Sequence, residues 1–77
     1  MGKYIVTSAY RDREEGYIDP SYEVVGTKAR CREFVNHYVN RAAYVQDRFE
    51  DTDGNEVTEL VLANGSELVL KIQMFKD

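Results

Sequence analysis

Acidic side chains crowd into one stretch of this sequence, between residues 47 and 59. Six carboxylates and one arginine give that stretch a net charge of −5, within a 77-residue chain whose net charge is −4. Spaced carboxylates can imitate a phosphate backbone and occupy a basic groove that normally takes nucleic acid. We therefore expect this stretch to bind a basic surface of another protein, through Asp47, Glu50, Asp51, Asp53, Glu56 and Glu59. The alternative is a solvated charged strand edge that blocks strand addition.

The centre of this acidic stretch also invites comparison with a calcium-binding loop. The EF-hand pattern requires glycine at its sixth position, so Gly54 would make Phe49 the first residue and Leu60 the twelfth. Both of those positions need oxygen ligands, which neither side chain supplies. We therefore expect a solvated hairpin tip, with no metal and no cofactor.

Basic side chains gather instead between residues 27 and 41, where four cations face one carboxylate and the net charge is +3. Lys28 and Arg30 would lie in the first turn of a helix, where the dipole favours anions and each exposed cation costs about 0.3–1 kcal/mol. Free amides and these cations could together hold an anion. The same cations could equally receive an acidic loop, from a partner or from this chain at Glu14 and Glu15. The alternative function is therefore a small anion- or nucleic-acid-binding domain that uses Thr27, Lys28, Arg30 and Arg32.

No set of residues has the spacing of a catalytic centre. His37 is the only histidine, and Glu33, four residues before it, is better interpreted as a surface pairing partner than as part of a general-base pair. Cys31 is the only cysteine, so no disulfide can form within the chain. It falls on an apolar helix stripe, which indicates a small core residue rather than a nucleophile. We expect no enzymatic activity.

Aromatic and aliphatic residues supply a second class of candidate binding residues. The chain has six tyrosines and no tryptophan, and tyrosine is enriched in recognition surfaces because it buries much area at little entropic cost. So many tyrosines cannot all be buried in a small core. A homodimer could use the same apolar surface as a partner protein. The expected apolar contacts are Tyr10, Tyr17, Tyr44, Leu60, Leu62 and Val69.

The elements that must position these residues form an α+β domain, an antiparallel sheet of four to five strands with one helix packed on one face, in the order β-β-α-β-β-β. β-Branched and aromatic residues predict strands at 3–10 and 22–25, and the charged residues 11–20 predict an exposed loop between them. Thr27 can cap a helix through its side-chain hydroxyl. Apolar residues that recur at spacings of three and four from Cys31 to Ala42 predict the helix that follows this cap.

The last third of the chain is a predicted meander of three strands. Asp53–Gly54 and Asn64–Gly65 are short-hairpin signals, and they separate strands at roughly 43–51, 56–63 and 66–75. A strand at 43–51 is preferred to the alternative, a helix that continues through Phe49, because residues 43–45 lead directly into the first turn signal.

The lengths of the two turns decide which side chains face the helix. Two-residue loops at both turns would join a polar face of the first strand to an apolar face of the third, and one extra residue in one turn corrects this. Asp51–Gly54 suits a type I turn with glycine in a G1 bulge. We predict that the first turn is bulged and the second is plain, with an inner face of Val45, Phe49, Val57, Val61, Leu68, Leu70 and Ile72. A bulge in the second turn would instead bring Leu60 and Leu62 inward.

Size and charge narrow the function classes. A single domain over residues 1–77 suits a binding module better than a self-contained enzyme, and the net negative charge argues against direct nucleic-acid binding. The chain shows neither a secretory h-region nor a membrane-length apolar run, which predicts a cytoplasmic protein. We expect a non-enzymatic interaction module. Its sharpest form is a phage or mobile-element inhibitor that mimics nucleic acid, since small acidic α+β proteins are typical of such accessory genes.

Overall fold

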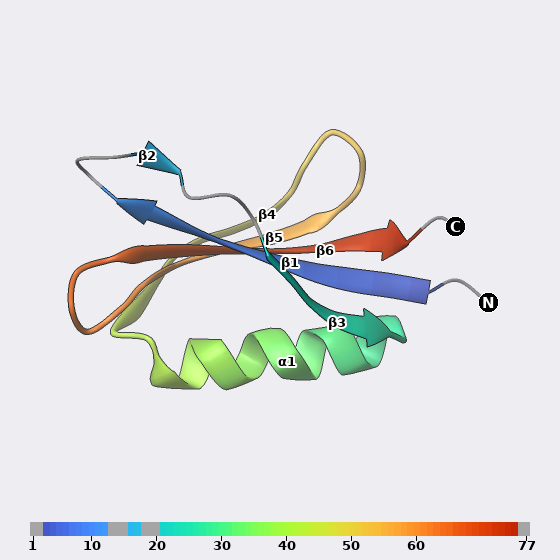
Figure 1. The fold of residues 1–77 in the computed structure, drawn as a ribbon, viewed down its shortest axis with the longest axis horizontal. Coiled ribbons are helices and arrows are strands. Elements are labelled where there is room, and N and C mark those ends of the chain that lie inside the picture. Colours follow the sequence, from blue (N-terminus) through green and yellow to red (C-terminus); the bar gives the residue numbers. More distant parts are fainter. Residues whose placement is uncertain (1–2, 13–15, 18–20, 76–77) are drawn as a thin grey trace.

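The computed structural model describes residues 3–12, 16–17 and 21–75, which form one sheet and one helix (Figure 1). The elements are β1 (Lys3–Asp12), β2 (Gly16–Tyr17), β3 (Ser21–Gly26), α1 (Lys28–Arg41), β4 (Tyr44–Glu50), β5 (Glu56–Val61) and β6 (Glu67–Phe75). The α+β class and the expected element order are confirmed, with β2 as an additional two-residue strand. Within the described ranges, no helix has the length and apolar character needed to span a bilayer.

The sheet is antiparallel throughout and runs in the order β2-β1-β6-β5-β4, with β3 also paired to β1. The central strands β1 and β6 pair from Lys3 opposite Phe75 to Arg11 opposite Glu67. β1 continues to Asp12 and β2 pairs back onto it, so the predicted loop over 11–20 is wrong for these residues. The pairing with β6, which includes an Arg11–Glu67 ion pair of 3.3 Å, extends the strand despite its charged sequence. Residues 13–15 and 18–20 of that predicted loop lie outside the described residues.

The helix begins after its predicted cap, Thr27, and ends at Arg41, followed by Ala42 in an extended conformation. The Thr27 hydroxyl accepts a hydrogen bond from the Arg30 amide at 3.1 Å, which satisfies one of the free first-turn donors. At the other end, the Ala42 amide donates to the carbonyls of Tyr38 and Val39. The chain then enters β4, so the alternative of a helix running on through Phe49 is wrong.

The core lies between α1 and one face of the sheet, which we call the helix-side face. Figure 1 shows α1 lying along that face. Cys31 is fully buried there, as its place on the apolar stripe predicts. The buried core consists of Val6, Cys31, Val35, Leu60, Leu68, Leu70 and Ile72, with Tyr4, Phe34, Tyr38, Val39, Ala42 and Leu62 packed around it.

The turn between β4 and β5 is the predicted bulged turn. The Gly54 amide donates to the Asp51 carbonyl, and the Asp51 amide donates to the Asn55 carbonyl, both at 3.0 Å. Gly54 has φ +81°, a conformation that costs a residue with a side chain more than it costs glycine. This is a type I turn followed by a G1 bulge.

The turn between β5 and β6 has the same design, and the predicted two-residue turn is wrong. The Gly65 amide donates to the Leu62 carbonyl, the Leu62 amide donates to the Ser66 carbonyl, and Gly65 has φ +86°. Asn64 does not adopt a positive φ, as a two-residue type I′ turn would require. Its side chain accepts from the Ser66 amide at 3.0 Å instead.

The second bulge exchanges the two faces of β5 relative to the prediction. Leu60 stands opposite Leu68 and is fully buried under the helix, while Leu62 packs against the same core. Val57 and Val61 therefore lie on the face turned away from α1, which we call the far face. The predicted placement of Val57, Val61 and Phe49 on the helix-side face is wrong because one added turn residue inverts the whole register, although Val57 is buried on the far face.

Candidate protein-interaction surface

The outer side of β4 is an open sheet edge, which we call the β4 edge. β4 bonds to β5 along one side, and no described strand pairs with its other side. All seven of its side chains, from Tyr44 to Glu50, are exposed. Such an edge presents a row of backbone donors and acceptors that can receive another chain.

The register shows which backbone groups point outward. Asp51 exchanges bonds with the β5 side of the hairpin, and antiparallel strands alternate between bonded and non-bonded pairs. Phe49, opposite Val57, therefore turns its amide and carbonyl toward β5, while Arg48 and Glu50 turn theirs outward. The Arg48 amide accordingly donates to the Asp47 side chain, at 2.8 Å from Oδ1, rather than to β5.

A β-bulge interrupts the first half of this edge. Val45 stands opposite Leu60 and Asp47 stands opposite Glu59, so Gln46 is the extra residue between them. Because a bulge breaks the alternation of faces, Val45 shares the helix-side face with Leu60 while Phe49 shares the far face with Val57. The regular part of the edge is therefore Asp47–Glu50.

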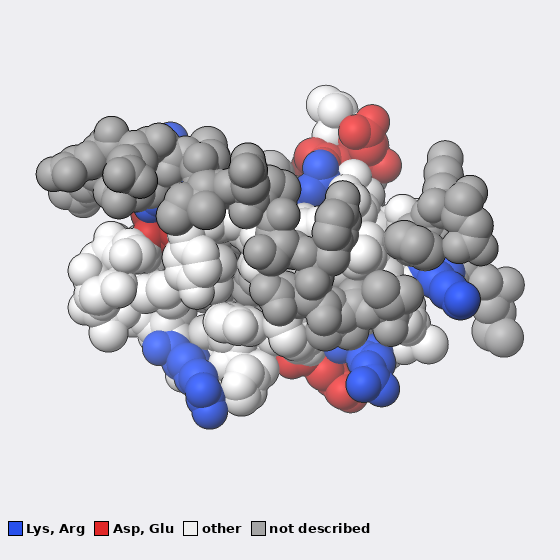
Figure 2. Space-filling view, in the orientation of Figure 1, with Lys and Arg blue, Asp and Glu red and all other residues white. Residues whose placement is uncertain are grey.

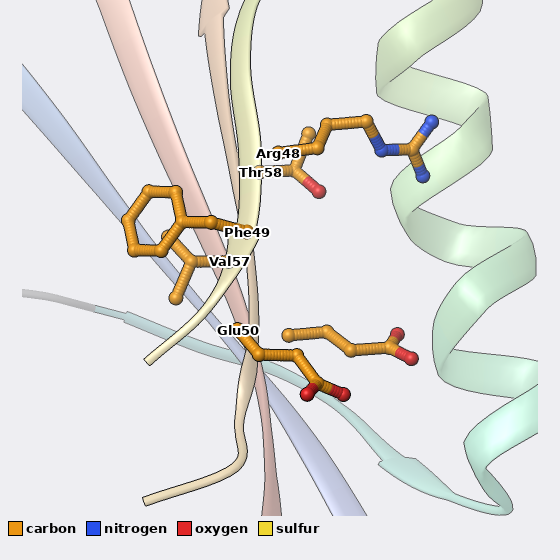
Figure 3. A pocket seen from close by; sticks show the side chains of 6 residues that line it. Arg48, Phe49, Glu50, Val57 and Thr58 are labelled. Atoms are coloured by element: carbon orange, nitrogen blue, oxygen red, sulfur yellow. The ribbon is translucent and has the colours of Figure 1, made fainter. Parts of the chain in front are cut away.

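Like charges oppose each other across β4 and β5. Asp47 is paired with Glu59 on the far face, and Glu50 is paired with Glu56 on the helix-side face. Figure 3 shows the alternation: Arg48 and Thr58 extend toward α1, whereas Phe49 and Val57 extend away from it. Directly opposed like charges destabilise a sheet, so a cation that approaches the far face would relieve the repulsion between Asp47 and Glu59.

Glu56 is neutralised within the protein by the start of α1. Its carboxylate accepts from Arg32 Nε at 3.1 and 3.2 Å and from Arg32 Nη2, and Lys28 Nζ lies 3.9 Å from it. The hydrogen bond from Arg32 is the main cause that lowers the pKa of the Glu56 carboxyl, and the charges of Lys28 and Arg48 act in the same direction. Glu56 therefore fastens β5 to the helix and is not a free member of the acidic surface.

The predicted anion site at the helix start is thus occupied by a carboxylate of the same chain. An acidic loop of a partner or of this chain, such as Glu14–Glu15, was one possible occupant; Glu14 and Glu15 lie outside the described residues, and the residue found there is Glu56. Thr27 acts as the helix cap and Arg30 is exposed. Lys28 also lies over the Tyr4 ring, with 5.7 Å between Nζ and the ring centroid. Of the three predicted basic residues, Lys28 and Arg32 therefore make an intramolecular contact with Glu56.

Asp51 organises the hairpin turn. Its Oδ1 accepts from the amides of Asp53 and Asn55 at 2.9 and 3.0 Å, and its Oδ2 lies 3.1 Å from Lys71 Nζ. The Asn55 amide is the main cause that lowers the pKa of the Asp51 carboxyl, and Lys71 and the Asp53 amide lower it further. Within the described part of the chain, the acidic residues of this stretch that form no ion pair are Asp47, Glu50, Asp53 and Glu59.

The acidic surface is therefore centred on the β4–β5 hairpin. Figure 2 shows acidic atoms gathered at the hairpin tip, and acidic and basic atoms side by side near the start of α1.

The predicted apolar contacts divide into exposed and buried residues. Tyr10 and Tyr44 are 44% and 59% exposed, and Val69 is half-buried on the far face. Leu60 is wrong as a surface residue because it is buried in the core, and Leu62 packs beside it. The Tyr17 side chain lies outside the described part of the structure.

Two exposed apolar residues of β4 were missing from the predicted contacts. Phe49 is 44% exposed on the far face and Val45 is 37% exposed beside the bulge. The signal that could have found them is turn length, because two bulged turns place Phe49 opposite Val57, outside the core.

A shallow hollow of about 300 Å³ lies at this hairpin, lined by Arg48, Phe49, Glu50, Glu56, Val57 and Thr58. Arg48, Glu50, Glu56 and Thr58 lie on the helix-side face, whereas Phe49 and Val57 lie on the far face (Figure 3). Comparisons with known protein families, curated proteins and solved structures found no match to this chain.

Proposed function

We propose that this chain is a non-enzymatic protein-interaction module whose β4 edge binds a basic surface of a partner protein. The observation that carries the proposal is the combination found at β4, an open strand exposed at all seven positions and bordered by carboxylates without ion pairs among the described residues. Exposed Tyr44 and Phe49 beside those carboxylates add the aromatic area that interface centres favour.

A narrower form of this proposal is an inhibitor that occupies a groove made for nucleic acid, as phage or mobile-element accessory proteins do. Its support is the small size of the chain and the net charge of −5 over residues 47–59. The anion-binding alternative loses its main support, since Arg32 and Lys28 already hold Glu56.

Affinity capture from a host lysate with matched variants tests the proposal. Asp47→Asn/Glu50→Gln removes two charges at the β4 edge. The control Glu33→Gln removes a charge from α1 that forms no ion pair within the described residues. We expect the same partner to be retained by the wild type and the control at about 50 mM salt, and to be lost at about 500 mM salt or with the edge variant. Capture that is equal for all three proteins, or independent of salt, contradicts an acidic binding edge.

A further inference from the structure

We propose that the partner contributes an extended basic segment, which adds to Asp47–Glu50 as a further strand of the sheet. This inference rests on the proposed function and deepens it, because it names both the mode of binding and the chemistry of the ligand. Addition of a strand to an open sheet edge is a recurring mode of peptide recognition, in which main-chain hydrogen bonds supply affinity and alternate side chains supply specificity.

The backbone of Asp47–Glu50 is suited to this addition. Arg48 and Glu50 both turn an amide and a carbonyl outward, which is the pattern that one side of an antiparallel or parallel partner strand requires. The bulge at Gln46 confines regular pairing to this half of β4. The ligand is therefore short, about four to five residues where it pairs.

The Asp47 carboxylate makes the edge selective for a basic segment. In the free protein this carboxylate receives the Arg48 amide at 2.8 Å, so it covers one of the outward donors. A lysine or arginine of the incoming strand, placed beside Asp47 on the far face, competes for the carboxylate and releases the amide for main-chain pairing. A neutral segment lacks that cation, and the covered amide then hinders its pairing.

The other side chains of the edge extend the same pattern. Glu50 lies on the helix-side face beside Arg48, and Phe49 lies on the far face beside Asp47. The segment that fits carries a cation next to Asp47, an aliphatic or aromatic side chain next to Phe49, and a second cation next to Glu50, because same-face neighbours on adjacent strands make the side-chain contacts.

A second copy of this chain fits the edge less well. Two β4 strands side by side would bring together two stretches that each carry a net charge of −5, and like charges facing each other across strands are unfavourable. A pure guard against strand addition is also a poor explanation. Charged side chains on the edge strand alone can guard it, whereas Asp47 also opposes Glu59 on β5, and neither forms an ion pair within the described residues.

Proline substitution separates main-chain pairing from charge. Glu50→Pro removes an outward amide, and proline is tolerated on edge strands where that amide faces solvent. Glu50→Gln makes the same change in charge and keeps the amide. Arg48→Pro and Arg48→Ala form a second pair. Both variants lose the same cation, which favours a basic ligand equally in each, so the two differ only in the backbone amide. Circular dichroism checks that each variant folds, and N-methylation of the Glu50 amide in a synthetic chain replaces any proline variant that does not.

The probe is a 12-residue peptide selected on the wild-type protein from a random displayed library and then synthesised with a fluorophore. We expect selected peptides to be basic, with two lysine or arginine residues three positions apart, because Asp47 and Glu50 lie three residues apart on opposite faces of the strand. Fluorescence anisotropy should show at least tenfold weaker binding to Glu50→Pro than to Glu50→Gln, and to Arg48→Pro than to Arg48→Ala.

Other outcomes overturn the inference in distinguishable ways. Equal binding within each pair, with binding still weakened by Asp47→Asn/Glu50→Gln, rules out strand addition and leaves the acidic interaction edge standing. Binding that is insensitive to the charge variant as well removes both proposals. Selection of no basic peptide overturns strand addition by a basic segment. A dimer in light scattering that Glu50→Pro dissociates would assign the edge to a second copy of the chain.

Discussion

Truncation of neighbouring side chains on β5 tests the register on which the interaction surface depends. Leu60→Ala removes a side chain that is 0% exposed beneath α1, whereas Val61→Ala shortens a half-buried side chain on the far face. The two residues are adjacent in the sequence and both are aliphatic, so their ranking depends on which face each one occupies. The bulged second turn predicts that Leu60→Ala is the more damaging change.

The expected difference is large for a domain of this size. Truncation of a fully buried leucine to alanine costs about 3 kcal/mol, because a cavity remains where the side chain was. Truncation of a half-buried valine costs about 0.5–1 kcal/mol from the lost apolar burial. A small domain without disulfides has roughly 3–5 kcal/mol of stability, so Leu60→Ala should lower the melting temperature by roughly 12–24 °C or prevent folding.

Urea unfolding followed by far-ultraviolet circular dichroism measures both variants, since the chain has no tryptophan to report by fluorescence. Leu60→Val, expected to cost about 1 kcal/mol, keeps the comparison measurable if the alanine variant does not fold. A plain two-residue turn at Asn64–Gly65 would place Val61 in the core and reverse the ranking. A larger loss for Val61→Ala than for Leu60→Ala would therefore refute the register.

Three further predictions concern pH, reactivity and turn conformation. The lowered pKa of the Glu56 carboxyl stabilises the fold above its ordinary value of 4.5, and this contribution is lost as pH falls through the lower folded value. In urea unfolding at neutral and acidic pH, the free energy of unfolding should therefore fall less for Glu56→Gln than for the control Glu33→Gln. Burial raises the pKa of the Cys31 thiol, so alkylation at neutral pH should follow global unfolding; rapid alkylation of the folded protein would contradict its core position. Gly65→Ala should cost about 1–2 kcal/mol because of its positive φ, clearly more than Asn64→Ala in the same urea assay, and equal costs would count against a G1 bulge.

The local signals of the chain predicted most of the elements. Thr27 and the stripe from Cys31 to Ala42 located the helix to within a residue of its observed ends, because capping and periodicity are properties of contiguous residues. The first hairpin turn was also predictable, since the acidic residue at position 51 and Gly54 belong to one short motif.

The second turn shows where local signals stop. A two-residue type I′ turn and a bulged type I turn both accept Asn64–Gly65, and both place a glycine at positive φ. The choice between them depends on how β5 packs against the whole sheet. A difference of one residue then exchanges Leu60 with Val61 between core and far face, so a small local ambiguity became a large error in the predicted core.

The candidate site divides in the same way. Composition predicted an acidic surface on the β4–β5 hairpin, and Asp47, Glu50 and Asp53 are exposed there. It could not predict that Glu56 would meet Arg32, because those residues are 24 positions apart and come together only through the packing of α1 on the sheet. Ion pairs between elements depend on register, which is decided by the fold as a whole.

Amide hydrogen exchange at single-residue resolution tests the β4 edge most directly. In the free protein the Glu50 amide faces outward and the Phe49 amide faces β5, so Glu50 should exchange quickly and Phe49 slowly. A saturating basic peptide selected as above should slow exchange at Glu50 and Arg48 and leave the amides of α1 unchanged. Unchanged exchange at Glu50, with new protection confined to the start of α1, would contradict the β4 edge as the binding site.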